Sequence, residues 1–210
     1  MDRKKVLLIG AGGHARACID IIEQEGRFSV YGLTGLPSEV GQKLLGYPVL
    51  GTDVDMSRYL MEAPYALVAV GQIKSVEPRK RLFRALVEAG FEMPTIVSPR
   101  GYVSPHAEVG YGTIVMHGAV VNAGAKVGAN CILNSQSLVE HDVVIGDHCH
   151  IATGASINSG VRVGAETFIG SNSSIRQGLR IGPGCLIGMG QRILSDCADG
   201  IHIPGRVGTK

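Results

Sequence analysis

Aliphatic residues recur at every sixth position through the second half of the chain. Seventeen successive positions in steps of six, from Val97 to Ile193, are all Val, Leu or Ile. The fourth residue after each is mostly small, and glycine often follows the aliphatic residue directly. A period of six matches neither an α-helix nor a plain alternating strand, but it fits a short strand followed by a corner. Three such strands make one coil, and successive coils stack about 4.8 Å apart.

This pattern predicts a hexapeptide parallel β-helix, which we expect to be left-handed and to cover residues 96–210. The aliphatic residues point inward, and the small residues fill the rest of the interior. Four of the five cysteines take the small inward position, namely Cys131, Cys149, Cys185 and Cys197. Free cysteine commonly behaves as a small buried apolar residue, so we interpret these thiols as packing groups.

The first 95 residues alternate between strand and helix patterns. The apolar run 5–9 predicts a strand, and Gly10–Ala15 forms a glycine-rich turn after it. Further strands are predicted over 29–33 and 65–70, and helices over 16–25 (with Ala17 and Ile21 facing inward), 53–61 and 76–89. Such alternation is typical of a parallel α/β sheet, so we predict a small Rossmann-like domain over residues 1–95.

The glycine turn has the pattern G-x-G-x-x-A between a strand and a helix. Glycines let a phosphate approach the backbone, and the helix N-terminus attracts negative charge. We favour a bound nucleotide diphosphate. A dinucleotide and a turn without a ligand remain alternatives, because the acidic residue expected after the second strand for a ribose hydroxyl is missing from Tyr31–Gly35.

Composition narrows the class of protein further. Hydrophobic residues make up 45% and charged residues 18% of the 210 residues, which excludes a disordered chain. The net charge of +2 comes without a long basic run, so we expect neither nucleic acid nor a membrane surface as a partner. The N-terminus lacks a signal-peptide pattern, and an odd number of unpaired cysteines suits a reducing compartment. We therefore expect a cytoplasmic protein without a membrane span.

The turn GAGGHA, the segment Gly46–Gly51 and the hexapeptide pattern together resemble the NeuD-type sugar O-acyltransferases. That family is similar to the UDP-4-amino-sugar N-acetyltransferases of bacillosamine biosynthesis. The resemblance implies an acetyl-CoA-dependent N-acetyltransferase of surface glycan biosynthesis. It also implies a homotrimer with active sites between subunits, a UDP-sugar bound by residues 1–95 and acetyl-CoA bound by residues 96–210, with no metal.

The resemblance also assigns residues to the expected site. His141 is the base with Asp142 beside it, and the groups around the cofactor are His150, Gly160 and Arg206. The substrate-binding residues are Gly10, Gly12, Gly13, His14, Gly71 and Asn134. The chain departs from the family in lacking the acid after the second strand, and in reading Ile203-Pro204-Gly205-Arg206 where the family commonly has G-x-P-A-K.

Apart from the family resemblance, the residues themselves allow two interpretations of His141. It lies on an outward corner of the repeat beside an acid, which suits a general base and equally a solvated histidine. His150 lies half a coil away, so the two converge only if β-helices pack around a threefold axis. His117, His148 and His150 also suggest a zinc site of the carbon dioxide hydratase type, but His117 and His148 lie at different angular positions, so we expect no metal.

Other functions remain open at this point. The alternatives are an O-acetyltransferase of a free sugar such as sialic acid, an enzyme for a longer acyl group, and a non-catalytic β-helix scaffold. The acceptor sugar distinguishes the enzymes from one another, and acetyl-CoA binding distinguishes an enzyme from a scaffold.

Overall fold

The computed structural model describes residues 3–205 and divides into two compact units, Met1–Ile96 and Val97–Lys210. The division falls next to the expected boundary at residue 95. Among the described residues, no helix is both long and apolar enough to cross a membrane.

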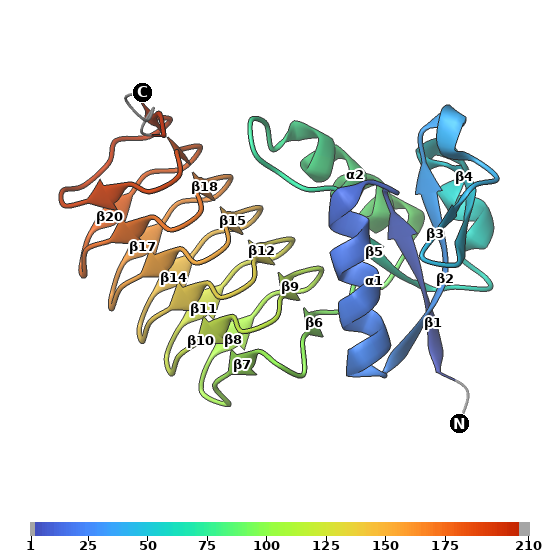
Figure 1. Ribbon diagram of the computed structural model, residues 1–210, viewed down its shortest axis with the longest axis horizontal. Coiled ribbons are helices and arrows are strands. Elements are labelled where there is room, and N and C mark those ends of the chain that lie inside the picture. The colour runs from blue at the N-terminus through green and yellow to red at the C-terminus, as the bar shows by residue number, and fades with distance from the viewer. Residues whose placement is uncertain (1–2, 206–210) are drawn as a thin grey trace. The chain divides into compact units, whose positions relative to one another are not determined.

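The first unit is a five-stranded sheet with the strand order β3-β4-β2-β1-β5. All its neighbouring strands are parallel except the antiparallel pair β3 and β4. Helix α1 packs against β2, and its place beside the sheet can be followed in Figure 1. The elements are β1 (Lys4–Ile9), α1 (Gly13–Glu25), β2 (Phe28–Gly35), η1 (Pro37–Glu39), β3 (Lys43–Leu44), β4 (Tyr47–Thr52), η2 (Asp53–Tyr59), β5 (Tyr65–Val68) and α2 (Glu77–Ala89).

Three details of this unit differ from the sequence predictions. Helix α1 begins at Gly13, inside the glycine turn, and Ala17 is exposed while Ala15 is buried. Segment η2 is a 3₁₀ helix rather than an α-helix. Strand β4 was not predicted, because Pro48 and the glycines around it read as a turn rather than a strand.

The second unit is the predicted left-handed parallel β-helix. Its strands form three sheets, each built from every third strand (Figure 1). They are β6 (Ile96–Val97), β7 (Tyr102–Val103), β8 (Glu108–Val109), β9 (Ile114–Val115), β10 (Val120–Val121), β11 (Lys126–Val127), β12 (Ile132–Leu133), β13 (Leu138–Val139), β14 (Val144–Ile145), β15 (His150–Ile151), β16 (Ser156–Ile157), β17 (Arg162–Val163), β18 (Phe168–Ile169), β19 (Ser174–Ile175), β20 (Arg180–Ile181), β21 (Leu186–Ile187), β22 (Arg192–Ile193) and β23 (His202–Ile203).

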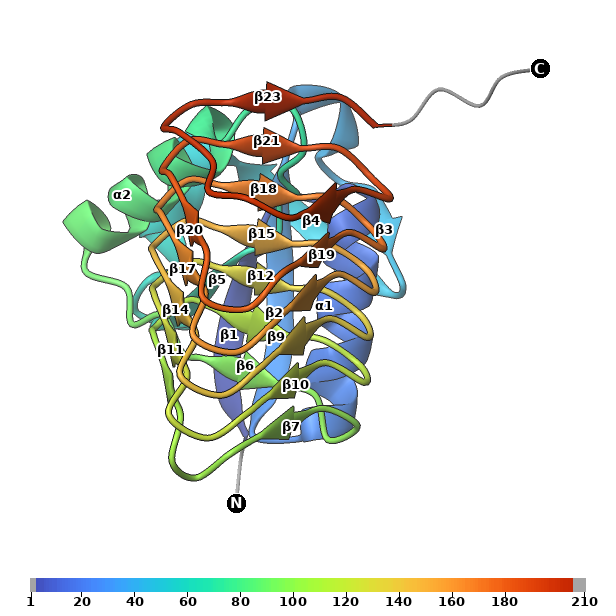
Figure 2. The same ribbon diagram turned by 90° about the vertical axis from the view of Figure 1, so that its left-hand side faces the viewer.

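The register of the β-helix follows from its sequence period. Leu133 pairs with Ile151, and Ile151 with Ile169, so each residue stacks on the equivalent residue of the next coil. Figure 2 shows one of the three stacks, in which β12, β15, β18 and β21 lie above one another. The aliphatic residue of each strand from Val115 to Ile193 is buried in one continuous core. The six-residue period of aliphatic residues therefore shows directly which residues are buried.

Thiols and hydroxyls form a second ladder inside the β-helix. Thr113 donates to the Gly128 carbonyl (2.8 Å) and accepts from the Cys131 amide (2.9 Å). The Cys149 Sγ lies 3.2 Å from the Gly164 carbonyl in the same way. Burial is the main cause that raises the pKa of Cys149 well above its ordinary value. These thiols are neutral hydrogen-bonding groups of the interior, in agreement with their interpretation as packing groups.

The ladder predicts how position 149 responds to substitution. Cys149→Ala removes a buried polar contact and leaves a small cavity, so we expect it to lower the free energy of unfolding by about 2 kcal/mol. Cys149→Thr restores both hydrogen-bonding roles, as at Thr113, and should cost less than about 1 kcal/mol. Urea unfolding of both variants checks this. Equal losses would show that the ladder contributes nothing.

Candidate functional site

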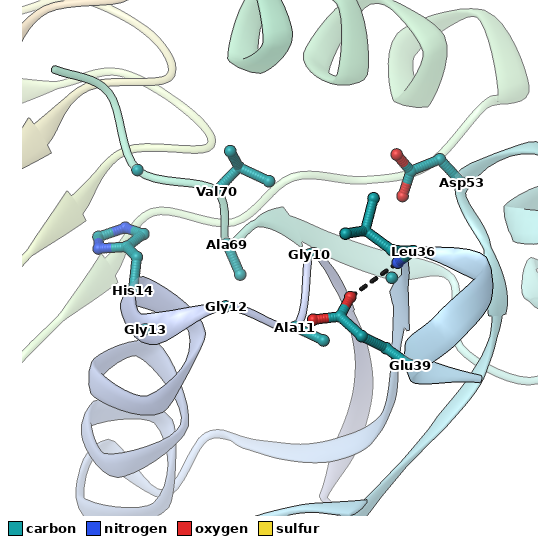
Figure 3. A pocket seen from close by; sticks show the side chains of 12 residues that line it. Gly10, Ala11, Gly12, Gly13, His14, Leu36, Glu39, Asp53, Ala69 and Val70 are labelled. Carbon is teal, nitrogen blue, oxygen red and sulfur yellow. Dashed lines mark hydrogen bonds between the residues drawn. The ribbon is translucent and has the colours of Figure 1, made fainter. Parts of the chain in front are cut away.

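A cavity of about 230 Å³ lies at the carboxyl end of the first sheet (Figure 3). Its walls are the glycine turn, the segments after β2 and β5, and the start of η2. The lining residues are Gly10, Ala11, Gly12, Gly13, His14, Gly35, Leu36, Glu39, Asp53, Ala69, Val70 and Gly71. The structure thus brings together five of the residues predicted to bind substrate: Gly10, Gly12, Gly13, His14 and Gly71.

Backbone geometry explains why glycine occupies the start of this turn. Gly10 has φ +111°, a conformation that favours glycine, and a Cβ there would lie 2.6 Å from Val70 Cγ2. Its amide donates to the Thr34 carbonyl at 3.1 Å, which ties the turn to β2. The turn is therefore held between the ends of two strands with no room for a side chain.

The first turn of α1 faces this cavity. Gly12 is the N-cap residue and has no side chain with which to cap the first amides. The amides of the first turn and the helix dipole together make such an end attractive to an anion. His14 is half-buried on the same turn. Gly71 lies next to it, since a Cβ built on Gly71 would be 3.7 Å from the His14 Cβ. The arrangement suits a phosphate group with an imidazole beside it.

Two carboxylates that the sequence analysis missed also line the cavity. Glu39 Oε2 accepts from the Leu36 amide at 2.7 Å, and Asp53 Oδ1 accepts from Thr34 Oγ1 at 2.9 Å. A Cβ at Gly35 would lie 2.6 Å from Glu39 Oε2, so the glycine makes room for this acid. Figure 3 shows Glu39 beside Ala11 and Asp53 beyond Leu36. The carboxylates that line the cavity therefore come from η1 and η2 rather than from the end of β2.

The sequence held a partial signal for Asp53. Thr52 is followed by Asp53 and Asp55, a common pattern at helix starts. Asp55 takes the capping role, accepting from the Thr52 amide (3.0 Å) and hydroxyl (2.8 Å), and these hydrogen bonds lower its pKa. Asp53 is therefore left to face the cavity, with Arg81 3.8 Å from its second oxygen.

In the β-helix, His141 and Asp142 occupy an exposed corner. His141 Nδ1 lies 2.9 Å from Asp142 Oδ2, and Asp142 has a left-handed φ of +61°. Because a carboxylate only accepts, this contact places the proton on Nδ1 and leaves Nε2 as an acceptor. Glu140 Oε2 accepts the His141 amide, and the Gly160 amide donates to the His141 carbonyl at 3.1 Å. The backbone of His141 is thereby fixed from two sides, with the ring in solvent.

Asn134 and His150 form a separate pair on another sheet. Asn134 Nδ2 lies 3.2 Å from His150 Nε2, while its Oδ1 accepts from the Ser135 amide. His150 is only 6% exposed and packs edge-on against the Phe168 ring at 5.2 Å. The sequence analysis assigned these two residues to different ligands, yet the structure places them in contact.

Two other histidines of the β-helix each have a separate partner, and one predicted residue cannot be placed. Arg206 falls outside the described residues. His117 bonds Ser98 (Nδ1 to Oγ, 2.6 Å) and His148 bonds Asn130 (Nδ1 to Nδ2, 2.9 Å), so each has its own partner. Across residues 3–205 there is no group of three or more His, Cys, Asp or Glu side chains that could hold a metal ion.

An α/β unit with a glycine-turn cavity, joined to a hexapeptide β-helix, defines a class of bacterial acyltransferases. The PglD N-terminal domain model matches residues 5–86. The model of the bacterial transferase hexapeptide (six repeats) matches residues 124–159, and that of the hexapeptide repeat of succinyl-transferase matches residues 160–194. The chain belongs to the NeuD/PglD-type sugar acetyltransferases, as its resemblance implied.

Solved structures of whole proteins agree with this assignment. The acetyltransferase domain of PglB from Neisseria gonorrhoeae is 30% identical, with 97% of each chain covered and a TM-score of 0.88. Perosamine N-acetyltransferase from Caulobacter crescentus, in complex with CoA and GDP-perosamine, is 28% identical over 96% of this chain and 93% of that one, with a TM-score of 0.90. WeeI from Acinetobacter baumannii shares the fold at 23% identity over 96% and 97% of the chains, with a TM-score of 0.81. The protein is therefore an acetyltransferase.

Proposed function

We propose that the protein transfers the acetyl group of acetyl-CoA to the amino group of a UDP-4-amino-sugar in surface glycan biosynthesis. The observation that carries this proposal is the similarity over nearly the whole chain to the Caulobacter enzyme, whose structure holds CoA and GDP-perosamine together. The Neisseria domain has also been solved in complex with acetyl coenzyme A. Both relatives contain the two units found here, so a similar pair of substrates suits this chain.

The diphosphate of the sugar nucleotide would lie at the first turn of α1. Gly10, Gly12 and Gly13 allow its close approach, and His14 and Gly71 border it. Glu39 and Asp53 would accept hydrogen bonds from the N–H and O–H groups of the nucleoside, as the acid after the second strand does in other nucleotide-binding folds.

His141 would act as the general base. Its free Nε2 takes the proton as the sugar amine attacks the thioester carbonyl, while Asp142 holds the Nδ1–H and stabilises the imidazolium. The new C–N bond gives a tetrahedral intermediate. The C–S bond then breaks, and the CoA thiolate takes the proton back from His141. No acyl-enzyme forms in this scheme.

The acetyl-CoA site would include His150, Gly160 and Arg206, with Asn134 at the substrate end. Within this group the Asn134 amide nitrogen, which only donates, would orient the His150 ring through Nε2. We further propose a homotrimer with active sites between subunits, since His141 and His150 lie on different sides of one coil. The outer face that carries Tyr102, Val120 and Leu138 supplies apolar area for such an interface.

Calorimetry with the purified protein tests the proposal. We expect acetyl-CoA, and separately a UDP-4-amino-sugar, to bind with micromolar dissociation constants, and light scattering to give the mass of a trimer. Tight binding of a GDP-linked rather than a UDP-linked amino sugar would show that the substrate's nucleobase is guanine and not uracil. Binding of acetyl-CoA and a free sugar without any nucleotide would indicate a free-sugar acyltransferase, and binding of neither substrate would end the enzyme proposal.

A further inference from the structure

Arg79 is a charged side chain that is completely buried in the first unit. It lies on the first turns of α2 and is 0% exposed. Burying a guanidinium is costly unless its donors are hydrogen-bonded. Its Nη1 donates to the Val68 carbonyl at 2.7 Å and to the Val70 carbonyl at 2.8 Å. The buried guanidinium thus binds backbone carbonyls at the end of strand β5.

The position of β5 in the sheet explains why these carbonyls need a donor. β1 pairs with one side of β5. On the other side Glu92 pairs with Pro64 and Ala66, so the edge is open only from Val68 onward. The Ala69 amide bonds the Ile9 carbonyl of β1, so the residues on either side of it, Val68 and Val70, face the open edge. Arg79 occupies this edge and extends the hydrogen bonding of the strand two residues beyond its end at Val68. Both hydrogen bonds come from one guanidinium nitrogen, whose two N–H groups point in fixed directions in the plane of the group.

The segment that Arg79 holds is a wall of the nucleotide cavity. Ala69, Val70 and Gly71 line the cavity opposite the glycine turn. Val70 also packs against Gly10 so closely that a Cβ on Gly10 would lie 2.6 Å from its Cγ2. Figure 3 shows Ala69 and Val70 directly beside Gly10. A displacement of Val70 would therefore move the turn that faces the phosphates.

The charge of Arg79 also acts on α1. Burial raises the pKa of the Cys18 thiol to about 12, and the positive charge of Arg79 opposes that rise. Cys18 lies one turn after His14 on the same helix. The guanidinium thus lies within electrostatic range of the helix whose N-terminus faces the cavity.

We infer that Arg79 is a positioning residue for nucleotide binding. It acts through the Val68 and Val70 carbonyls, which fix the wall against which the glycine turn packs. This inference rests on the proposed function, since it assumes that the cavity binds the diphosphate of the sugar nucleotide. Arg79 has no contact with the substrate in this account.

Steady-state kinetics and calorimetry of Arg79→Lys test the inference. Lysine keeps the charge, but its ammonium lacks the planar guanidinium geometry that fixes the two N–H directions toward the carbonyls. We expect the KM and the dissociation constant of the sugar nucleotide to rise about tenfold. The kcat and the KM of acetyl-CoA should stay within about twofold of the wild-type values. Arg79→Gln, which removes the charge and shortens the side chain, should show the same split.

Arg84→Met is the matched control, because Arg84 lies exposed on the same helix. We expect it to leave both KM values unchanged. A lower melting temperature for Arg79→Lys and Arg79→Gln with an unchanged sugar-nucleotide KM would show a purely structural role and overturn the inference. An equal loss of affinity for both substrates would also overturn it. Failure of the wild-type protein to bind any sugar nucleotide would instead contradict the proposed function.

Discussion

His141→Ala is expected to lower kcat about 1,000-fold, the usual contribution of a positioned general base. The ring is exposed and its only role in this account is to take the amine proton, so the fold should not change. The melting temperature, the mass and the affinities for both substrates should therefore match the wild-type values. The C. crescentus variants in which one histidine is replaced by asparagine or alanine still hold CoA and GDP-perosamine.

Two comparisons sharpen this prediction. His106→Ala removes another exposed β-helix histidine and should leave kcat unchanged. Asp142→Asn keeps a hydrogen-bonding group beside His141 but removes the charge that stabilises the imidazolium, and should lower kcat by about tenfold or more. Turnover of His141→Ala within about tenfold of the wild type would show that another group is the base.

Gly164→Ala is expected to lower the melting temperature by about 10 °C, the largest stability effect that we predict. A Cβ at Gly164 would lie 2.3 Å from the Pro183 nitrogen and 2.6 Å from its Cα. These are backbone atoms of the next coil, so they cannot yield as a flexible side chain would. The substitution forces two coils apart and weakens the hydrogen bond from the Gly164 amide to the Ile181 carbonyl, now 2.8 Å.

Gly160→Ala is the matched control in the same coil. Gly160 has a left-handed φ of +69°, but a Cβ there has no atom within 4 Å. The substitution should then lower the free energy of unfolding by about 1 kcal/mol, because alanine disfavours the left-handed backbone conformation. This corresponds to a fall of about 3 °C in melting temperature. Thermal unfolding of both variants checks the difference. A loss at Gly160 equal to that at Gly164 would show that conformation, and not the spacing between coils, decides which glycines the β-helix needs.

The β-helix was predictable from the sequence because its contacts repeat. Each aliphatic residue meets its equivalent one coil away, so Val139 and Ile157 are buried for the same reason, and the period shows it. The same frame correctly placed His141 on an exposed corner. The glycine turn was also predicted, since strand, turn and helix are adjacent in the sequence.

The cavity's acids were not predictable in the same way. Glu39 and Asp53 come from segments that follow different strands, and they meet only because β4 lies beside β2. Arg79 gave no signal either, because its position on α2 does not show that β5 is an edge strand. The contact between Asn134 and His150 depends on where one strand ends and another begins within a coil. Sequence periodicity shows which residues are buried, but side chains from separate segments meet only through the tertiary fold.

The most direct test of the proposed function is an assay of acetyl transfer with the wild-type protein. Acetyl-CoA and a UDP-4-amino-sugar are incubated with the protein, free thiol is followed over time, and the nucleotide product is analysed by mass spectrometry and NMR. We predict one thiol released for each N-acetylated UDP-sugar formed, and about 1,000-fold slower release with His141→Ala. Absence of product with UDP- and GDP-linked amino sugars, despite binding of acetyl-CoA, would contradict the proposal that a nucleotide-linked amine is the acceptor.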